Sequence, residues 1–245
     1  MEGKIKLTYF EIPGRGEPIR LALWIGKKEF KDVHVQFSEW SKLKPNAPWG
    51  TLPFLELANG KSIGQTRSCT RFACKLAGLY PEDPYQAALC DDIFDILEDL
   101  QKIVNDTGKG MEKEDKLKAR KEVVTSGKAA DILKKIEASI SENGKDGHAV
   151  GKSHFESSFQ KYGVITWNGS TLGDKVTMAD IAIFCYGTML VCGFFDGIPK
   201  DLLNSYPKLN AVRKTVGSHP QVIARYEAEK SEKPIWKVFS SVKDL

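Results

Sequence analysis

The chain has 245 residues, of which 41% are hydrophobic and 28% are charged, and its formal net charge is +4. This composition excludes a wholly disordered chain, because disorder combines low hydrophobicity with high net charge. The small net charge also argues against a nucleic-acid partner, which would require basic clusters or stripes. The charges are nevertheless segregated: residues 1–80 hold 13 Lys and Arg against 7 Asp and Glu, whereas residues 81–101 hold 7 acids and no base.

The lack of a recognisable targeting signal and the pattern of the cysteines indicate the compartment in which we expect the protein. The first six residues lack the apolar core of a signal peptide, and the longest uncharged run, 181–195, is shorter than a membrane span. The five cysteines form no CxxC pair and no zinc-ligand spacing, as is typical of reduced thiols. We therefore expect a cytoplasmic protein without a membrane partner, and we interpret 181–195 as part of a buried core helix.

The N-terminal segment predicts a strand, a helix and a second strand. Residues 4–10 alternate between polar and apolar, a turn follows at 13–16, and Glu17-Pro18 begins an apolar helix that can end at Gly26. Residues 33–37 alternate again and predict the second strand. A unit of this length implies two parallel strands with a right-handed crossover.

The next segment predicts a hairpin and a helix. Residues 52–57 and 61–64 flank Asn59-Gly60, a strong hairpin signal, and a helix over 67–77 would have Thr66 as its N-cap and Gly78 as its stop. Beyond Pro84 the apolar spacing predicts only helices, over 85–107, 113–140, 177–192 and 207–229.

These elements predict two domains. The order βαβ-ββα over 1–81 is that of an α/β thioredoxin-like domain, and 85–245 reads as an all-α helical domain with a long insertion near 141–175. A thioredoxin-like domain carries its chemistry at the end of the first strand. This chain has no cysteine there, which disfavours disulfide exchange. It has instead the phenol of Tyr9 beside an arginine-containing turn.

Several motifs in one order resemble the cytosolic glutathione transferases. They are Tyr9-Phe10, the run from Gly14 to Arg20, Trp40 with Lys44, Gly50 to Pro53, Gln65-Thr66, and Thr177 to Asp180. The first two motifs are most similar to the sigma class, which includes prostaglandin D synthases and S-crystallins. The resemblance implies a homodimeric enzyme that attaches the thiolate of its co-substrate, glutathione, to hydrophobic electrophiles, a detoxification reaction.

The resemblance also implies a role for each matching residue. Tyr9, supported by Arg15, would donate a hydrogen bond that favours the thiolate. Trp40 and Lys44 would hold the glycyl end, and a cis Pro53 would present the Leu52 backbone to the cysteinyl unit. The implied glutathione-binding set is Tyr9, Arg15, Trp40, Lys44, Gly50, Thr51, Leu52, Pro53, Gln65, Thr66 and Asp99.

Gln65 and Thr66 would bind the γ-glutamyl carboxylate, because the N-terminus of a helix attracts anions. Among the acids of 81–101, Asp92, Asp95 and Asp99 share one helix face, which composition alone explains as a solvated surface. The resemblance places Asp99 across a twofold interface, near glutathione bound to the other subunit. We expect no metal at the catalytic site; Asp95, Glu98 and Asp99 are the candidates for an additional divalent cation.

The second-substrate pocket is expected to contain Phe10, Ile12 and Gly14. The insertion near 141–175, or the tail after Lys230 with Trp236 and Phe239, could also line it. Two alternatives stay open: a glutathione-dependent isomerase or peroxidase such as prostaglandin D synthase, and a non-catalytic protein like the S-crystallins. Residues 100–112 lack the aromatic residue that prostaglandin D synthases place over the pocket, and only 4 Met in the chain speak against a lens crystallin.

Overall fold

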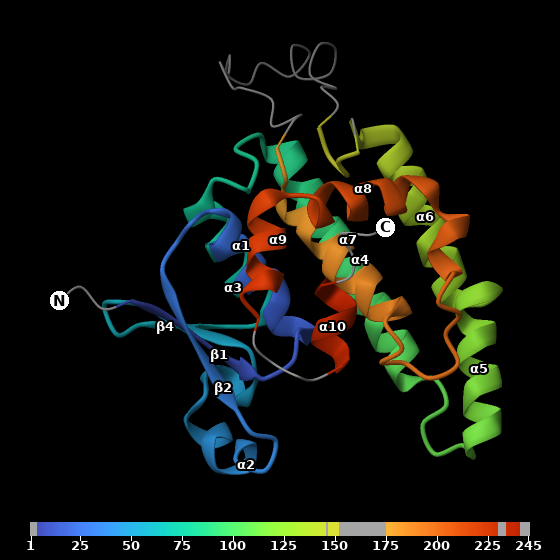
Figure 1. Cartoon of the computed structure of the whole chain (residues 1–245), viewed down its shortest axis with the longest axis horizontal. Helices are drawn as coiled ribbons and strands as arrows, with labels where there is room; N and C mark the ends of the chain where they lie inside the picture. The colour runs from blue at the N-terminus through green and yellow to red at the C-terminus, as the bar shows by residue number, and fades with distance from the viewer. Residues whose placement is uncertain (1–3, 146, 152–174, 230–233, 241–245) are drawn as a thin grey trace.

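The computed structural model describes residues 4–145, 147–151, 175–229 and 234–240 (Figure 1). Its single sheet has four strands: β1 (Ile5–Phe10), β2 (Phe30–Val35), β3 (Phe54–Glu56) and β4 (Ser62–Gly64). The strand order is β2-β1-β3-β4, with β1 and β2 parallel and the other two pairs antiparallel. The predicted parallel unit and hairpin are therefore confirmed, although β2 begins and ends before the predicted 33–37.

Two helices, α1 (Glu17–Ile25) and α3 (Thr66–Ala77), lie between the sheet and the helical part of the molecule (Figure 1). The short α2 (Trp40–Leu43) was not predicted. The predicted N-cap of α3 is wrong: Gln65 occupies that position, and Thr66 is the first helical residue. Gln65 has a φ of 71°, so the backbone turns one residue earlier than the hydroxyl signal suggested.

The second part of the chain is built from helices. Its described helices are α4 (Pro84–Asp106), α5 (Lys113–Thr125), α6 (Lys128–Asn143), α7 (Met178–Val191), α8 (Pro207–Gly217), α9 (Pro220–Glu227) and α10 (Pro234–Ser240). The apolar helix α7 is buried from Met178 to Leu190 and contacts α1, α4 and α8, so it forms the centre of the core. No helix in the described ranges is long and apolar enough to cross a membrane.

Two predicted long helices are each interrupted. The prediction over 113–140 fails at Gly127, where α5 has ended and α6 begins; a Cβ there would lie 2.9 Å from the Val123 Cα. The prediction over 207–229 fails before Pro220, which lacks an N–H and disfavours helical geometry in the preceding residue. The His219 side chain then caps α9 by accepting from the Gln221 N–H at 3.2 Å.

The basic first segment and the acidic stretch meet inside one chain. Arg71 binds Asp91 at 2.8 Å, Arg67 binds Asp95, and Arg15 lies 3.7 Å from Glu98. Each arginine belongs to the sheet-containing part and each acid to α4. The charge segregation thus corresponds to a contact between the two halves of the fold.

The start of α7 is the capping box predicted at Thr177 to Asp180. The Asp180 carboxylate accepts from the Thr177 N–H at 2.7 Å and from the Thr177 hydroxyl at 2.8 Å. It also accepts from the Ala149 N–H at 2.6 Å and lies 3.4 Å from His148. Asp180 therefore joins the core helix to the end of the described part of the 141–175 insertion, of which residues 152–174 lie outside the described structure.

Replacing Asp180 by Ala should lower the free energy of unfolding by about 3 kcal/mol, since it removes a helix cap and leaves buried donors without an acceptor. Urea unfolding of the variant measures the change. Asp131→Ala is the matched control, because Asp131 is also in the first turn of a helix but its side chain is 64% exposed. Equal midpoints for the two variants would contradict this account of the α7 cap.

Candidate active site

Two neighbouring cavities open where β1 ends against α4. One has a volume of ≈ 250 Å³ and the other of ≈ 260 Å³. Arg15 and Lys102 line both of them, so the cavities meet at these two cations. The first cavity is lined by Arg15, Thr51, Leu52, Gln65, Thr66, Glu98, Asp99 and Lys102. The second is lined by Tyr9, Ile12, Gly14, Arg15, Gln101, Lys102, Asn105, Met189, Phe194 and Phe195.

The first cavity combines a sheet segment with the start of a helix. The Leu52–Pro53 peptide bond is cis, as the resemblance implied, and Leu52 lies just before β3. Gln65 and Thr66 lie at the N-terminus of α3, where the first N–H groups have no partner within the helix and the helix dipole favours negative charge. This end of the cavity can therefore bind a carboxylate.

Tyr9 contributes the phenol that points to the second cavity. Its side chain is buried, and its hydroxyl accepts a hydrogen bond from the Arg15 backbone N–H at 3.1 Å. Burial raises the pKa of Tyr9, and this effect exceeds the lowering by the Arg15 N–H and by the Arg15 and Arg20 charges. A phenol is already protonated at neutral pH, and the raised pKa extends this state to higher pH, so Tyr9 can donate a hydrogen bond to an anion.

The glycines of the following turn allow this placement. A Cβ on Gly14 would lie 2.8 Å from the Tyr9 hydroxyl oxygen, and one on Gly16 would lie 2.6 Å from the Tyr9 ring. Gly14 also has a φ of +41°, which side chains rarely adopt. The Gly14-Arg15-Gly16 sequence therefore lets the chain wrap closely around the phenol.

The second cavity has an apolar wall and a polar wall. Ile12 and Gly14 line it as predicted, together with residues that the sequence analysis missed on α7 and just after it: Met189, Phe194 and Phe195. The polar wall consists of Gln101, Lys102 and Asn105 on α4. Asn105 follows Gln101 by four residues and Lys102 by three, which is the spacing of one helix face. This signal was not used to predict the cavity.

One prediction about this cavity needs correction, and one alternative that was left open does not hold. Phe10 does not line it; its ring stacks on Phe37 with centroids 4.2 Å apart and meets the edge of Trp40 at 6.4 Å. Trp236 and Phe239 in α10 do not line it either, because they are buried beside α9. The Phe10 ring also contacts the Tyr9 ring, with centroids 5.5 Å apart, so Phe10 lies beside the phenol without lining the cavity.

Trp40, Lys44, Gly50 and Pro53 line neither cavity. Trp40 and Lys44 lie on the connection between β2 and β3, and Lys44 is exposed beside Gly50, on which a Cβ would lie 3.7 Å from the lysine side chain. Pro53 is buried behind Leu52. The structure thus brings Thr51, Leu52, Gln65 and Thr66 together around the first cavity. Trp40, Lys44, Gly50 and Pro53 lie outside the linings of both cavities.

The candidate cation ligands are engaged otherwise. Asp95 pairs with Arg67, and Glu98 lies near Arg15 and accepts a hydrogen bond from the Tyr186 hydroxyl at 3.3 Å. Burial raises the pKa of Glu98 despite the neighbouring Arg15 charge. Across the described residues no group of three or more His, Cys, Asp or Glu could hold a metal ion. Asp99 is exposed at the rim of the first cavity.

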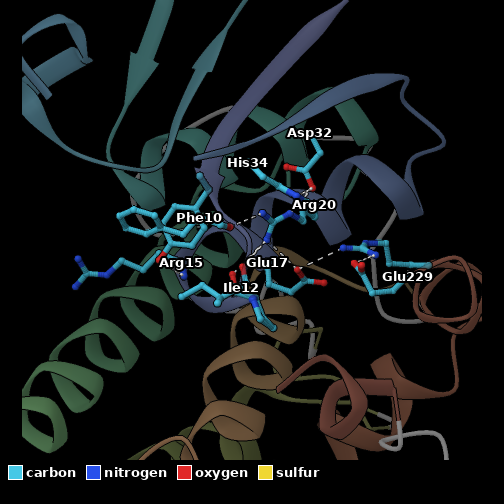
Figure 2. Close-up of polar contacts among 11 residues, drawn as sticks. Phe10, Ile12, Arg15, Glu17, Arg20, Asp32, His34 and Glu229 are labelled. Carbon is cyan, nitrogen blue, oxygen red and sulfur yellow. Dashed lines mark hydrogen bonds and ion pairs between the residues drawn. The ribbon is translucent and has the colours of Figure 1, made fainter. Parts of the chain in front are cut away.

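A buried arginine supports the turn after Tyr9, as Figure 2 shows. The Arg20 guanidinium donates to two carboxylates, Asp32 at 2.6 Å and Glu17 at 3.2 Å, and to three carbonyls, Ile12 at 2.9 Å and Phe10 and Pro13 at 3.3 Å. Burial alone would raise the pKa of Asp32, but hydrogen bonds and charges from His34 and Arg20 lower it overall. The signal for Arg20 in the sequence is that it is a lone charge between Ile19 and Leu21, and it was not among the predicted site residues.

Comparisons with known proteins agree with this geometry. The model of the "Glutathione S-transferase, C-terminal domain" family matches residues 155–230. Glutathione S-transferase 1 of Ascaris suum is 33% identical over 151 residues, which cover 60% of this chain and 72% of that protein. Glutathione S-transferase S1 of Drosophila melanogaster is 34% identical over 148 residues, 60% of this chain but only 57% of that protein's length.

The solved structure of the Ascaris lumbricoides glutathione S-transferase is similar over 95% of this chain and 100% of that one, with a TM-score of 0.68 and 27% identity. Proteins named hematopoietic prostaglandin D synthase and S-crystallin are also among the relatives. Both the fold and the sequence identity therefore lead to the same assignment. The chain belongs to the glutathione S-transferase family.

Proposed function

We propose that the protein is an active glutathione transferase that joins the glutathione thiolate to hydrophobic electrophiles. The observation that supports this most directly is the Tyr9 phenol, which is held by the Arg15 N–H and lines the second of two adjoining cavities. The cavity with the α3 N-terminus suits an anionic peptide, and the cavity with Ile12, Met189 and Phe195 suits an apolar compound.

In the proposed reaction, Tyr9 donates its hydroxyl proton in a hydrogen bond to the glutathione sulfur. This bond stabilises the thiolate over the thiol and so lowers the thiol pKa, while the Arg15 N–H orients the phenol oxygen. The thiol proton passes to solvent. The sulfur then uses an electron pair to form a bond to the electrophilic carbon, and the leaving group departs with the pair that bound it.

We assign the binding of the glutathione tripeptide to residues whose chemical groups suit its carboxylates and its backbone. Gln65 and Thr66 would hold the γ-glutamyl carboxylate at the start of α3, and the Leu52 backbone would pair with the cysteinyl unit. Trp40 and Lys44 would reach the glycyl carboxylate from the periphery, and Gly50, Thr51 and Pro53 shape the loop between these groups. The strained φ of Gln65 is consistent with a residue held in place for binding.

The two alternatives receive less support. On α4 the second cavity is lined by Gln101, Lys102 and Asn105, so no aromatic residue of that helix covers it as expected for prostaglandin isomerisation. A non-catalytic role like that of the S-crystallins would not require a phenol that lines an apolar cavity next to an anion-binding helix start. An activity panel with aryl halides, isothiocyanates and hydroperoxides separates these functions by product: conjugation yields a glutathione thioether, hydroperoxide reduction yields glutathione disulfide, and a non-catalytic protein yields neither.

The finer assignments belong to the same proposal. We assign the chain to the sigma class on the Tyr9-Phe10 and Gly14 to Arg20 motifs, and we place its detoxification reaction in the cytoplasm. We also propose a homodimer in which Asp99 approaches the glutathione of the partner subunit. Asp99 suits this role because it is exposed and forms no ion pair with any described residue.

Replacing Tyr9 by Phe should lower kcat about 10- to 100-fold, because a hydrogen bond to a charged group is lost. Glutathione affinity should change little, since the carboxylate contacts remain. In the wild type at saturating glutathione, kcat/KM for the electrophile should rise with pH as the bound thiol ionises. In the variant this rise should move to higher pH. Steady-state kinetics between pH 6 and 9 measure both effects.

Tyr206→Phe is the matched control, because Tyr206 is also buried and lines neither cavity. Its pH profile should follow that of the wild type. A Tyr9→Phe variant with wild-type turnover would remove Tyr9 from the mechanism.

Thr66→Val should raise the KM for glutathione about tenfold, because the buried hydroxyl at the start of α3 is lost without a change in shape. Thr66→Ser should retain most of the affinity, since it keeps the hydroxyl. Isothermal titration with glutathione provides the binding constants. Similar affinities for the Val and Ser variants would place the γ-glutamyl end elsewhere.

Mixing subunits tests the dimer and the role of Asp99 together. Tyr9→Phe and Asp99→Asn homodimers should each be impaired. If Asp99 serves the partner, a heterodimer of the two variants contains one intact site, so activity should recover to about half of one wild-type dimer. No recovery after verified exchange of subunits would show that Asp99 acts within its own chain, and a monomer in sedimentation would exclude the dimer.

A further inference from the structure

The C-terminal helix α10 packs on the polar network beneath the Tyr9 turn. Trp236 is 2% exposed, and its ring centroid lies 5.5 Å from the Arg20 Cζ and 5.1 Å from the Arg225 Cζ. Arg225 in turn lies 3.9 Å from the buried Glu17 carboxylate and binds Glu229 at 2.9 Å. A helix far along the chain thus covers the charges that surround the start of α1.

Arg20 connects this helix to Tyr9. Its guanidinium lies between two aromatic rings, with the Cζ 5.5 Å from the Trp236 centroid and 5.9 Å from the Tyr9 centroid. From there it donates to the carbonyls of Phe10, Ile12 and Pro13, which form the turn between Tyr9 and Arg15. Any tilt of the guanidinium would therefore alter several hydrogen bonds to this turn at once.

The turn, in turn, sets the environment of the phenol. The Arg15 N–H that binds the Tyr9 hydroxyl follows directly after Pro13 and Gly14, and the Gly16 and Glu17 N–H groups donate to the Pro13 carbonyl at 3.1 Å and 2.9 Å. The spacing around Gly14 and Gly16 is too tight to absorb a shift, because even a Cβ at either position would collide with the Tyr9 side chain.

We propose that Trp236 is a positioning residue for catalysis: by packing on the Arg20 guanidinium it holds the turn that orients Tyr9 and Arg15. The aromatic face is the relevant property, since a buried guanidinium is attracted to the electron-rich face of a tryptophan and an aliphatic side chain of similar size offers only packing. This inference rests on the proposed function of Tyr9. It assigns to the C-terminal helix an effect on the thiolate rather than a place in the substrate cavity.

α10 offers a matched control for simple core packing. Phe239 is 1% exposed and packs on Phe184 and Tyr226 with centroids 6.2 Å and 6.1 Å away, on the same helix as Trp236. The described contacts of its ring do not include Arg20. Trp236→Leu removes the aromatic face above Arg20, Trp236→Phe keeps an aromatic ring, and Phe239→Leu perturbs the apolar packing of α10 on Phe184 and Tyr226.

The first readout is the ionisation of bound glutathione, followed by the ultraviolet absorbance of the thiolate as pH is varied. Trp236→Leu should move this titration to higher pH and lower kcat about three- to tenfold, with a smaller change in the KM for glutathione. Trp236→Phe should restore most of the wild-type profile. Phe239→Leu should lower the melting temperature as Trp236→Leu does, but leave the titration unchanged.

The second readout does not depend on activity. Hydrogen exchange of the backbone amides of Ile12 and of residues 14–17 should be faster in Trp236→Leu and unchanged in Phe239→Leu, because only the first releases Arg20. If Trp236→Leu loses thermal stability but keeps the wild-type titration and exchange, α10 is merely structural and the inference is wrong. If the wild-type protein forms no bound thiolate, the proposed function fails instead, and exchange still decides whether Trp236 holds the turn.

Discussion

Arg20 has no contact with solvent, and its guanidinium donates to the carboxylates of Glu17 and Asp32 and to three carbonyls of the turn after β1. Removing this side chain would leave the buried Glu17 carboxylate with its nearest guanidinium, that of Arg225, 3.9 Å away, and breaking such a buried pair costs about 3–5 kcal/mol. The same group lies between Tyr9 and Trp236. The sheet, the first helix and the C-terminal helices therefore converge on one cation directly beneath the candidate active site.

The charge segregation has a related consequence. The pairs Arg15–Glu98, Arg67–Asp95 and Arg71–Asp91 all join the sheet-containing part to α4, and the first of these pairs lines the first cavity. Such partly exposed pairs contribute little to stability, so we interpret their role as alignment of the two parts around the cavity. Acids that the sequence analysis connected with a subunit interface or a cation thus serve mainly inside the chain. Asp99, which is exposed at the rim, is the member that can face outward.

Much of the fold could be predicted because its signals are local. Alternation in residues 4–10, the Asn59-Gly60 hairpin, the Thr177 to Asp180 capping box and the uncharged run of α7 each correspond to the structure. The predicted helix over 113–140 was wrong because the apolar spacing continues across a break between α5 and α6. At this break the Gly127 backbone packs so closely on Val123 that a side chain would not fit. The short α2 and α10 lack a long apolar period, so their formation depends on contacts with distant residues.

The sequence by itself determined which chemical groups are available: a phenol at a strand end, a glycine-rich turn that can wrap around it, and a helix start that attracts anions. Short-range order specifies these features, because each depends on a few neighbouring residues. Only the tertiary structure decided which groups meet. It turned Phe10 toward Phe37, brought Met189 and Phe195 to the second cavity, paired Glu98 with Arg15, and placed Trp236 on Arg20. These contacts join residues distant in the chain, and packing of the whole core sets them.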